Sequence, residues 1–315
     1  MRTRTLNQSP NKTGSFPVLG ATYMVSAGVI FAAINVLTQW VTGTYHFSSQ
    51  ALAFWQYGLS LIFFVPTLLK LGAGAFRTAH PVAHFVRVVF ATLGVQFFVG
   101  ALAAGVPIAQ VVAIDMTSPF IVIVAARLIL GERIGPHRAL ATIVGFVGGM
   151  LILAPWSDKF SVYSLLPLGA AAMWAGSSVM TKQLAAVERP ESVTVYLLAL
   201  LTPINAAFLL TSTGFDVGAA FALPGGTVLW VILALAALTA AAQYLLTLAY
   251  ARADASYLQT FDNVRLPLNT LAGWLVFAYA PDGYLWIGAV MIIGASLYLL
   301  RTEAGKPVGT DPLPA

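Results

Sequence analysis

The sequence contains no cysteine and few charged residues. Without cysteine, the chain cannot form disulfide frameworks, thiol chemistry, cysteine-ligated zinc sites or iron–sulfur clusters. Only 9 % of the 315 residues are charged, whereas soluble domains carry about 25 %. A soluble chain of this length would need charged residues to cover its core. The composition therefore predicts that much of the surface faces lipid.

Motifs for catalysis or nucleotide use are also missing. The sequence has no phosphate-binding loop, dinucleotide fingerprint or catalytic elbow. Of the four histidines, only His80 and His84 share a helical spacing, and two ligands do not complete a metal site. The net charge of +5 is spread as single residues between apolar runs, which argues against nucleic-acid binding. We therefore expect no enzyme activity, no cofactor, no metal and no nucleic-acid partner.

Long apolar stretches dominate what is present. Hydrophobic residues make up 59 % of the chain and the mean hydropathy is +0.84. A helix needs about 20 mostly apolar residues to cross the hydrocarbon core of a bilayer. Ten stretches meet this requirement, and we predict an all-α integral membrane protein whose transmembrane helices lie approximately at residues 17–40, 48–70, 85–104, 107–130, 136–156, 161–184, 191–212, 227–250, 253–280 and 283–301.

The distribution of lysine and arginine predicts the orientation of these helices. Basic connections tend to stay in the cytoplasm. Of the 16 basic residues, 14 lie in tails, connections or span ends on one side, only Lys159 falls in a connection on the other side, and Arg265 falls centrally inside a span. Ten helices with both termini cytoplasmic account for this asymmetry. We expect a multi-pass protein of the cell inner membrane in contact with the lipid bilayer.

Weak internal similarity predicts two repeats. A shift of 147 residues places Gln96 on Gln243 and Asp115 on Asp262. Because each half would contain an odd number of helices, the second half would enter the membrane inverted, as in many transporters that work by alternating access. We predict a cytoplasmic tail at 1–16, five-helix repeats at 17–156 and 161–301, and a second tail at 302–315.

Three ionisable side chains fall centrally inside expected spans, namely Asp115, Asp262 and Arg265. Charges at membrane depth are costly and usually face a cavity or a partner. In the ninth span, helical spacing places Gln259, Asp262, Arg265 and Asn269 on one face. This spacing predicts a polar face in an otherwise apolar helix.

Two interpretations of these charges remain open. Arg265 either binds a substrate carboxylate while an aspartate meets an amino group or carries a proton, or it forms a structural ion pair with Asp262. Asp115 and Asp262 are the candidates for proton coupling. Other polar or amphipathic side chains inside spans either line the same site or join helices. The predicted substrate-binding set is Arg265, Asp262, Asp115, Gln96, Gln243, Trp174, Asn35, Asn269 and Trp55.

Two local sequences carry a family resemblance. Residues 118–133 begin with Ser-Pro and end with Leu-Gly-Glu-Arg, and residues 145–149 read Gly-Phe-Val-Gly-Gly. With these features, residues 17–301 resemble the EamA branch of the drug/metabolite transporter superfamily. The second half departs from the pattern at 278–280, where Ala-Tyr-Ala stands in place of Gly-Glu. The resemblance implies ten helices in two inverted repeats and transport of amino acids, vitamins or related metabolites, mostly outward.

Three functional hypotheses follow. The leading one is export of a zwitterionic amino-acid-like or amino-acid-derived metabolite, including metallophore-type compounds, because one cation and two carboxylates complement both charges. The second is uptake of a vitamin or cofactor, such as a flavin stacking on Trp55 or Trp174. The third is a membrane scaffold without transport. Either a monomer or a homodimer fits the sequence.

Overall fold

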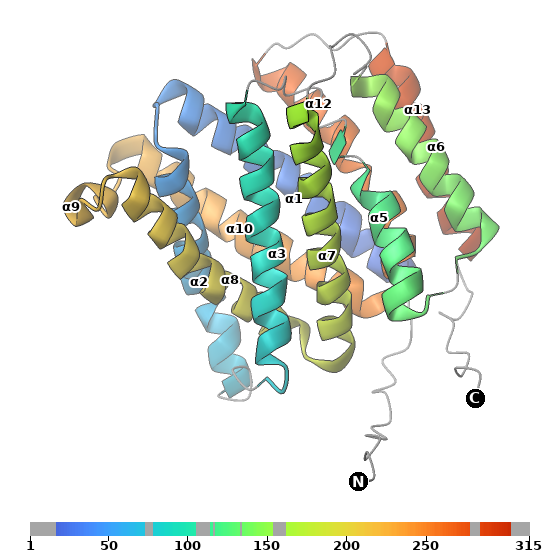
Figure 1. Ribbon diagram of the computed structural model, residues 1–315, viewed down its shortest axis with the longest axis horizontal. Helices are drawn as coiled ribbons and strands as arrows, with labels where there is room; N and C mark the ends of the chain where they lie inside the picture. Colours follow the sequence, from blue (N-terminus) through green and yellow to red (C-terminus); the bar gives the residue numbers. More distant parts are fainter. Residues whose placement is uncertain are drawn as a thin grey trace.

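The computed structural model describes residues 17–72, 78–104, 114–115, 117–132, 134–153, 162–277 and 284–303. Every regular element among them is a helix (Figure 1), which confirms the predicted all-α class for these residues. In chain order the elements are α1 (Pro17–Thr44), α2 (Ser49–Leu71), α3 (Pro81–Ala103), α5 (Ser118–Ala125), the π-helix η2 (Ala126–Leu130), α6 (Pro136–Leu153), the short η4 (Val162–Ser164), α7 (Leu165–Val187), α8 (Pro190–Ser212), α9 (Val217–Ala220), α10 (Gly226–Arg252), α11 (Ala255–Asp262), α12 (Arg265–Phe277) and α13 (Tyr284–Glu303).

Proline marks where several of these helices begin. α1, α3, α6 and α8 start at Pro17, Pro81, Pro136 and Pro190. The first turn of a helix has no intrahelical partner for its N–H groups, so a residue without an N–H is tolerated there, and its fixed φ favours helix. The sequence therefore sets these four boundaries locally.

Several helices have the length and surface of membrane spans. By length and composition, four of the described helices can cross a bilayer: Pro17–Thr44, Pro81–Phe98, Pro190–Ser212 and Gly226–Arg252. Large apolar side chains such as Leu69, Leu128 and Leu275 are more than three-quarters exposed. In water such a surface would aggregate, whereas lipid chains solvate it.

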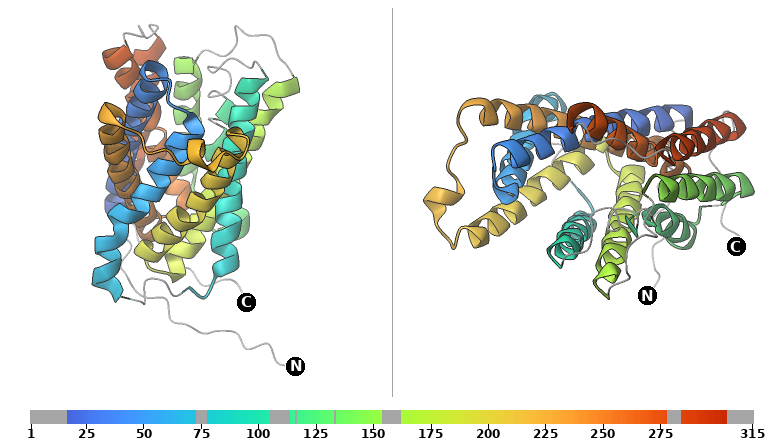
Figure 2. Two further views of the ribbon diagram at one scale, coloured as in Figure 1. Left: turned by 90° about the vertical axis from the view of Figure 1, so that its left-hand side faces the viewer. Right: turned by 90° about the horizontal axis from the view of Figure 1, so that it is seen from above.

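The helices pack in two groups and a pair. In the first group, α10 packs along α1 and α2, and α12 packs on α1. In the second group, α7 packs along α3 and α5, and α3 also contacts α8. α6 and α13 pair with each other. Figure 2 shows the groups as two rows when the molecule is seen from above, and they meet where α2 packs on α8 and α10 on α7.

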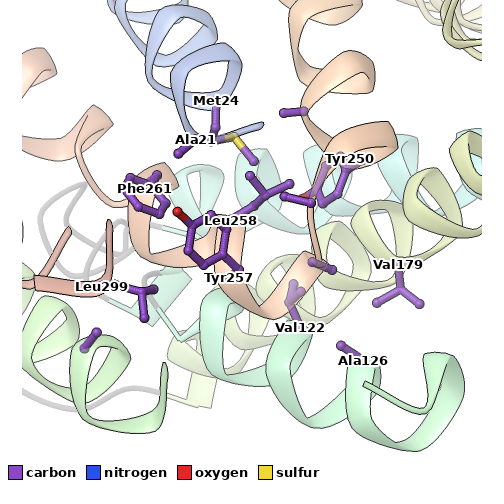
Figure 3. Packing of buried hydrophobic residues seen from close by; sticks show 14 of the residues in the cluster. Ala21, Met24, Val122, Ala126, Val179, Tyr250, Tyr257, Leu258, Phe261 and Leu299 are labelled. Atoms are coloured by element: carbon purple, nitrogen blue, oxygen red, sulfur yellow. The ribbon is translucent and has the colours of Figure 1, made fainter. Parts of the chain in front are cut away.

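The short helix α11 lies at the centre of the largest apolar cluster. Its Tyr257, Leu258 and Phe261 are buried and pack with Met24 of α1 and Val122 of α5 (Figure 3). α11 also contacts α6, α7, α10 and α13. α11 therefore contacts both groups and the α6–α13 pair, and it connects all three parts of the bundle.

Candidate functional site

The ninth expected span is interrupted where its polar residues lie. The sequence predicts one continuous helix over 253–280, but α11 ends at Asp262 and α12 begins at Arg265. Asn263 and Val264 form a turn, held by the N–H of Leu266 on the Asn263 carbonyl. Pro267 explains the break, because its ring would clash with the carbonyl four residues earlier and it has no N–H to donate.

The break places Asp262 and Arg265 in an ion pair at the junction of the two helices. The Arg265 guanidinium donates to Asp262 Oδ2. It also lies 5.5 Å from the ring centroid of Phe31 in α1, a cation–π contact. The arginine side chain is 38 % exposed and the aspartate 19 %. The pair is therefore internally compensated and still partly accessible.

A glycine in α1 makes room for the arginine. A Cβ atom at Gly28 would lie 2.8 Å from Arg265 Cγ, which is closer than side-chain atoms approach in folded proteins. Phe31 and Asn35 follow Gly28 at helical spacing and therefore share its face of α1. Further along this face, Asn35 Nδ2 donates to Asn269 Oδ1 at 3.1 Å. One face of α1 thus meets the polar face of α12.

Asp115 adds a second carboxylate to the site. It precedes α5, which begins at Ser118 with Pro119 in its first turn. Among the described residues, the buried Asp115 Oδ1 has no hydrogen-bond partner, but the carboxylate lies within electrostatic range of both Arg265 and Asp262. Residues 107–113, at the start of the expected span 107–130, and residue 116 lie outside the described residues. The three charges form one cluster that holds two carboxylates and one guanidinium.

Two further polar side chains border this cluster. Gln259 Nε2 donates to the Tyr250 hydroxyl at 3.1 Å, and both residues are buried. The Tyr250 hydroxyl is in electrostatic range of Asp262 and Arg265. Gln259 belonged to the predicted polar face, whereas Tyr250 was missed. Its position in α10, seven residues and two turns after Gln243, is the signal that would have suggested it.

The roles of the other predicted site residues stay predictions. Trp174 lies between α3 and α7, where its ring fills the space beside Gly94 and lies 5.6 Å from the Phe98 ring centroid. Trp55 packs in an apolar cluster with α1 and α10, and its buried Nε1 has no hydrogen-bond partner among the described residues. Gln96 is exposed and Gln243 half-buried. Neither of these two side chains forms a hydrogen bond with another described residue.

The arrangement can bind a polar molecule through side chains that the sequence leaves far apart. It brings together Asp115, Asp262, Arg265, Asn35 and Asn269 of the predicted set and adds Gln259 and Tyr250. It offers hydroxyl and amide groups for hydrogen bonds, an aromatic face at Phe31, and one cation whose charge is already balanced by its neighbour.

Comparison with known proteins places the sequence among transporters. Residues 18–154 match the EamA-like transporter family. The chain is 53 % identical to the riboflavin transporter of Rhizobium johnstonii over 91 % of its length and 92 % of that protein. It is 40 % identical to the riboflavin transporter of Vibrio cholerae, over 92 % and 95 % of the two chains. It is 26 % identical to the pseudopaline exporter of Pseudomonas aeruginosa, over 91 % and 97 %.

The fold is similar to that of a protein whose crystal structure is known. A protein of known crystal structure superimposes on this chain with a TM-score of 0.75, over 93 % of this chain and 99 % of that one. The two sequences are 20 % identical, so this likeness concerns the fold alone.

Proposed function

The chain belongs to the EamA-like transporter family, and from this membership we propose that it takes up riboflavin across the inner membrane. The observation that carries the proposal is the similarity, along nearly the full chain, to riboflavin transporters of two organisms. The vitamin hypothesis is therefore better supported than the leading sequence hypothesis of amino-acid-type export. The expectation of a membrane transporter for a small molecule stands.

The charge arrangement supports the same choice of substrate. Because Asp262 already neutralises Arg265, the carboxylate of a zwitterion would have to displace it. Riboflavin is uncharged at neutral pH and instead presents an aromatic three-ring system, an imide edge and a chain of hydroxyls. Amide groups such as those of Asn35 and Asn269 suit hydrogen bonding to that edge or chain, and the rings suit Phe31. We assign substrate contacts to Arg265, Asn35 and Asn269.

Helix pairing supports the proposed repeats at 17–156 and 161–301. If α7 corresponds to α1 and α10 to α3, the pairing of α1 with α10 maps onto that of α7 with α3. In the same way, α1 against α12 maps onto α7 against α5. A two-fold relation between inverted halves generates such exchanged pairs, and it supports ten spans with alternating access. The basic residues place both tails, 1–16 and 302–315, in the cytoplasm in this proposal.

Uptake of labelled riboflavin tests the proposed substrate and direction. Bacterial cells that cannot synthesise riboflavin and lack a transporter for it should grow on low external riboflavin when they express this chain, and they should accumulate [³H]riboflavin above the empty-vector control. An excess of unlabelled riboflavin should compete, whereas amino acids should not. Expressing cells that take up no label, although the protein is present in the membrane, would contradict the proposal.

The similarity to the pseudopaline exporter favours export of an amino-acid-derived metabolite as the second candidate function. Comparing the growth medium of cells with and without the gene distinguishes the two directions. Riboflavin depleted from the medium supports uptake. A zwitterionic metabolite enriched in the medium, without riboflavin depletion, supports export.

Proton coupling is proposed to run through Asp115. Its buried Oδ1 has no hydrogen-bond partner among the described residues and can therefore accept a proton, whereas protonating Asp262 would leave Arg265 unpaired. Asp115→Asn mimics the protonated state, so we expect riboflavin uptake into proteoliposomes that no longer responds to an imposed pH gradient but continues down a riboflavin gradient. If uptake by the parent protein ignores the pH gradient, coupling is absent.

A further inference from the structure

Polar bonds between different parts of the bundle gather at one of its ends. This end is where α7 and α10 finish and where α8 and α11 begin. The first of these bonds comes from Lys182 of α7, in the second group. Its ammonium donates to the backbone carbonyls of Tyr250 and Ala253, at 3.0 and 2.6 Å, where α10 of the first group ends. These carbonyls lie in the last turn of the helix, where a cation is favourable.

Glu132 makes a second connection at this end. Its carboxylate accepts hydrogen bonds from the N–H groups of Ala255 and Ser256, at 2.8 and 3.0 Å, and from the Ser256 hydroxyl at 2.6 Å. The N–H groups belong to the first turn of α11, which has no intrahelical acceptor for them. Gly131 has a φ of 68° at the end of η2, and this turn brings Glu132 to α11.

Arg138 and Asp254 complete the set. Arg138 of α6 donates to Asp254 Oδ2 at 2.9 Å and to the Ser256 hydroxyl at 3.0 Å. Asp254 lies in the connection between α10 and α11, and both side chains of the ion pair are 12 % exposed. Tyr244 of α10 also donates to Glu191 at the start of α8, at 2.6 Å. Each of these bonds joins α10, α11 or their connection to another part of the bundle.

A further set of polar residues at this end connects parts of the second group to one another. Glu188, between α7 and α8, accepts from Thr78 and pairs with His84 of α3 at 2.9 Å. Arg87 of α3 donates to the backbone carbonyl of Val193 in α8. All of these belong to the second group. Toward the opposite end, the described Asn35 and Gln96 are exposed.

We propose that Glu132, Arg138, Lys182 and Asp254 form a gate that closes this end of the bundle, and that these bonds break in each transport cycle. The bonds tie the ends of α10 and α11 to α6 and α7, so the two groups cannot separate at this end while they persist. These bonds are mostly shielded from water, so the loss of one partner leaves a backbone group or a charge without a hydrogen bond. Such a loss destabilises the closed state and shifts the population toward the state in which this end is open.

Cysteine labelling tests the gate without a transport assay. Because the chain has no cysteine, Ser178→Cys introduces a single thiol one turn of α7 deeper than Lys182. A membrane-impermeant maleimide is applied separately to each face of oriented membrane vesicles. In Glu132→Gln and Lys182→Met backgrounds, labelling from the gate face should rise by about tenfold, the change expected when bonds of this kind are lost. Labelling from the opposite face should fall.

The matched control is Glu188→Gln, which removes a carboxylate at the same end but within one helix group. It should leave labelling from both faces unchanged. The gate is disproved if neither gate variant changes labelling, or if Glu188→Gln changes it equally. Labelling that increases from both faces indicates loosened packing and also overturns the proposal. No substrate is present in this assay, so its result is independent of whether riboflavin is transported.

Discussion

Arg265→Gln is expected to abolish riboflavin uptake. The substitution removes the guanidinium and leaves Asp115 and Asp262 as two neighbouring carboxylates with no cation between them. Losing one partner of a fully buried ion pair costs about 3–5 kcal/mol, and solvent lowers this cost here because Arg265 is 38 % exposed. A change of about 1.4 kcal/mol corresponds to a factor of ten. Because the variant also loses the proposed substrate contact, we expect uptake of [³H]riboflavin to fall by at least one order of magnitude.

A neutral double variant separates substrate binding from a structural ion pair. In Asp262→Asn combined with Arg265→Gln, both charges of the pair are gone, and the two amide side chains can still form a hydrogen bond. If the pair only fixes the junction of α11 and α12, this variant should fold and transport. If Arg265 contacts the substrate, it should fold and remain inactive, which is the result that we expect.

The matched control is Arg301→Gln, an exposed arginine near the end of α13. It changes the net charge by the same amount and should leave uptake at the parental rate. Uptake at the parental rate in the Arg265→Gln single variant, with normal protein levels in the membrane, would remove Arg265 from the site.

Gly148→Ala is expected to disrupt the pairing of α6 with α13. A Cβ at this position would lie 2.8 Å from the backbone oxygen of Gly288, 3.0 Å from Met291 Cβ and 3.1 Å from Ile292 Cγ1. The backbone oxygen cannot move aside, so the two helices would have to separate. Overpacking costs about 1–3 kcal/mol, which outweighs the gain of up to about 1 kcal/mol from alanine in a helix. We expect a lower Tm and less monodisperse protein in detergent.

Gly294→Ala provides the control on the partner helix. A Cβ at Gly294 meets no heavy atom within 4 Å, so alanine there should keep the parental Tm or raise it through its helix propensity. Equal Tm values for the two variants, measured by the fluorescence of the purified protein during heating, would show that α6 and α13 tolerate separation.

The sequence was sufficient to find the charged cluster but not its geometry. Asp115, Asp262 and Arg265 stand out because charges at membrane depth are rare, whatever the arrangement of the helices. The break between α11 and α12 was missed because periodicity alone predicts a continuous helix. Pro267 can either kink or end a helix, and the sequence does not show which of the two occurs. Trp55 and Trp174 pack against apolar and aromatic neighbours, and their contact with the substrate stays a prediction.

The contacts of the gate residues could not be predicted from the sequence. In the sequence, Glu132 stands out only within the family-like Leu-Gly-Glu-Arg run, and Lys182 only counts among the 16 basic residues that predict the orientation of the helices. Their partners lie where α10 ends and α11 begins, 71 residues from Lys182 and 124 from Glu132 at the most distant contacts. A hydrogen bond to a backbone carbonyl or N–H depends on position rather than residue type, so the partner's sequence carries no signal for it.

Composition alone determined that this chain lies in a membrane as helices, because an apolar chain with so few charges can satisfy its backbone in lipid only through internal hydrogen bonds. The tertiary structure decided which polar groups meet. It showed that Arg265 is neutralised by Asp262 rather than left free for a carboxylate, and that one end of the bundle is tied by bonds between helix groups. Burial and charge balance depend on neighbours in space, and the order of residues along the chain does not specify those neighbours.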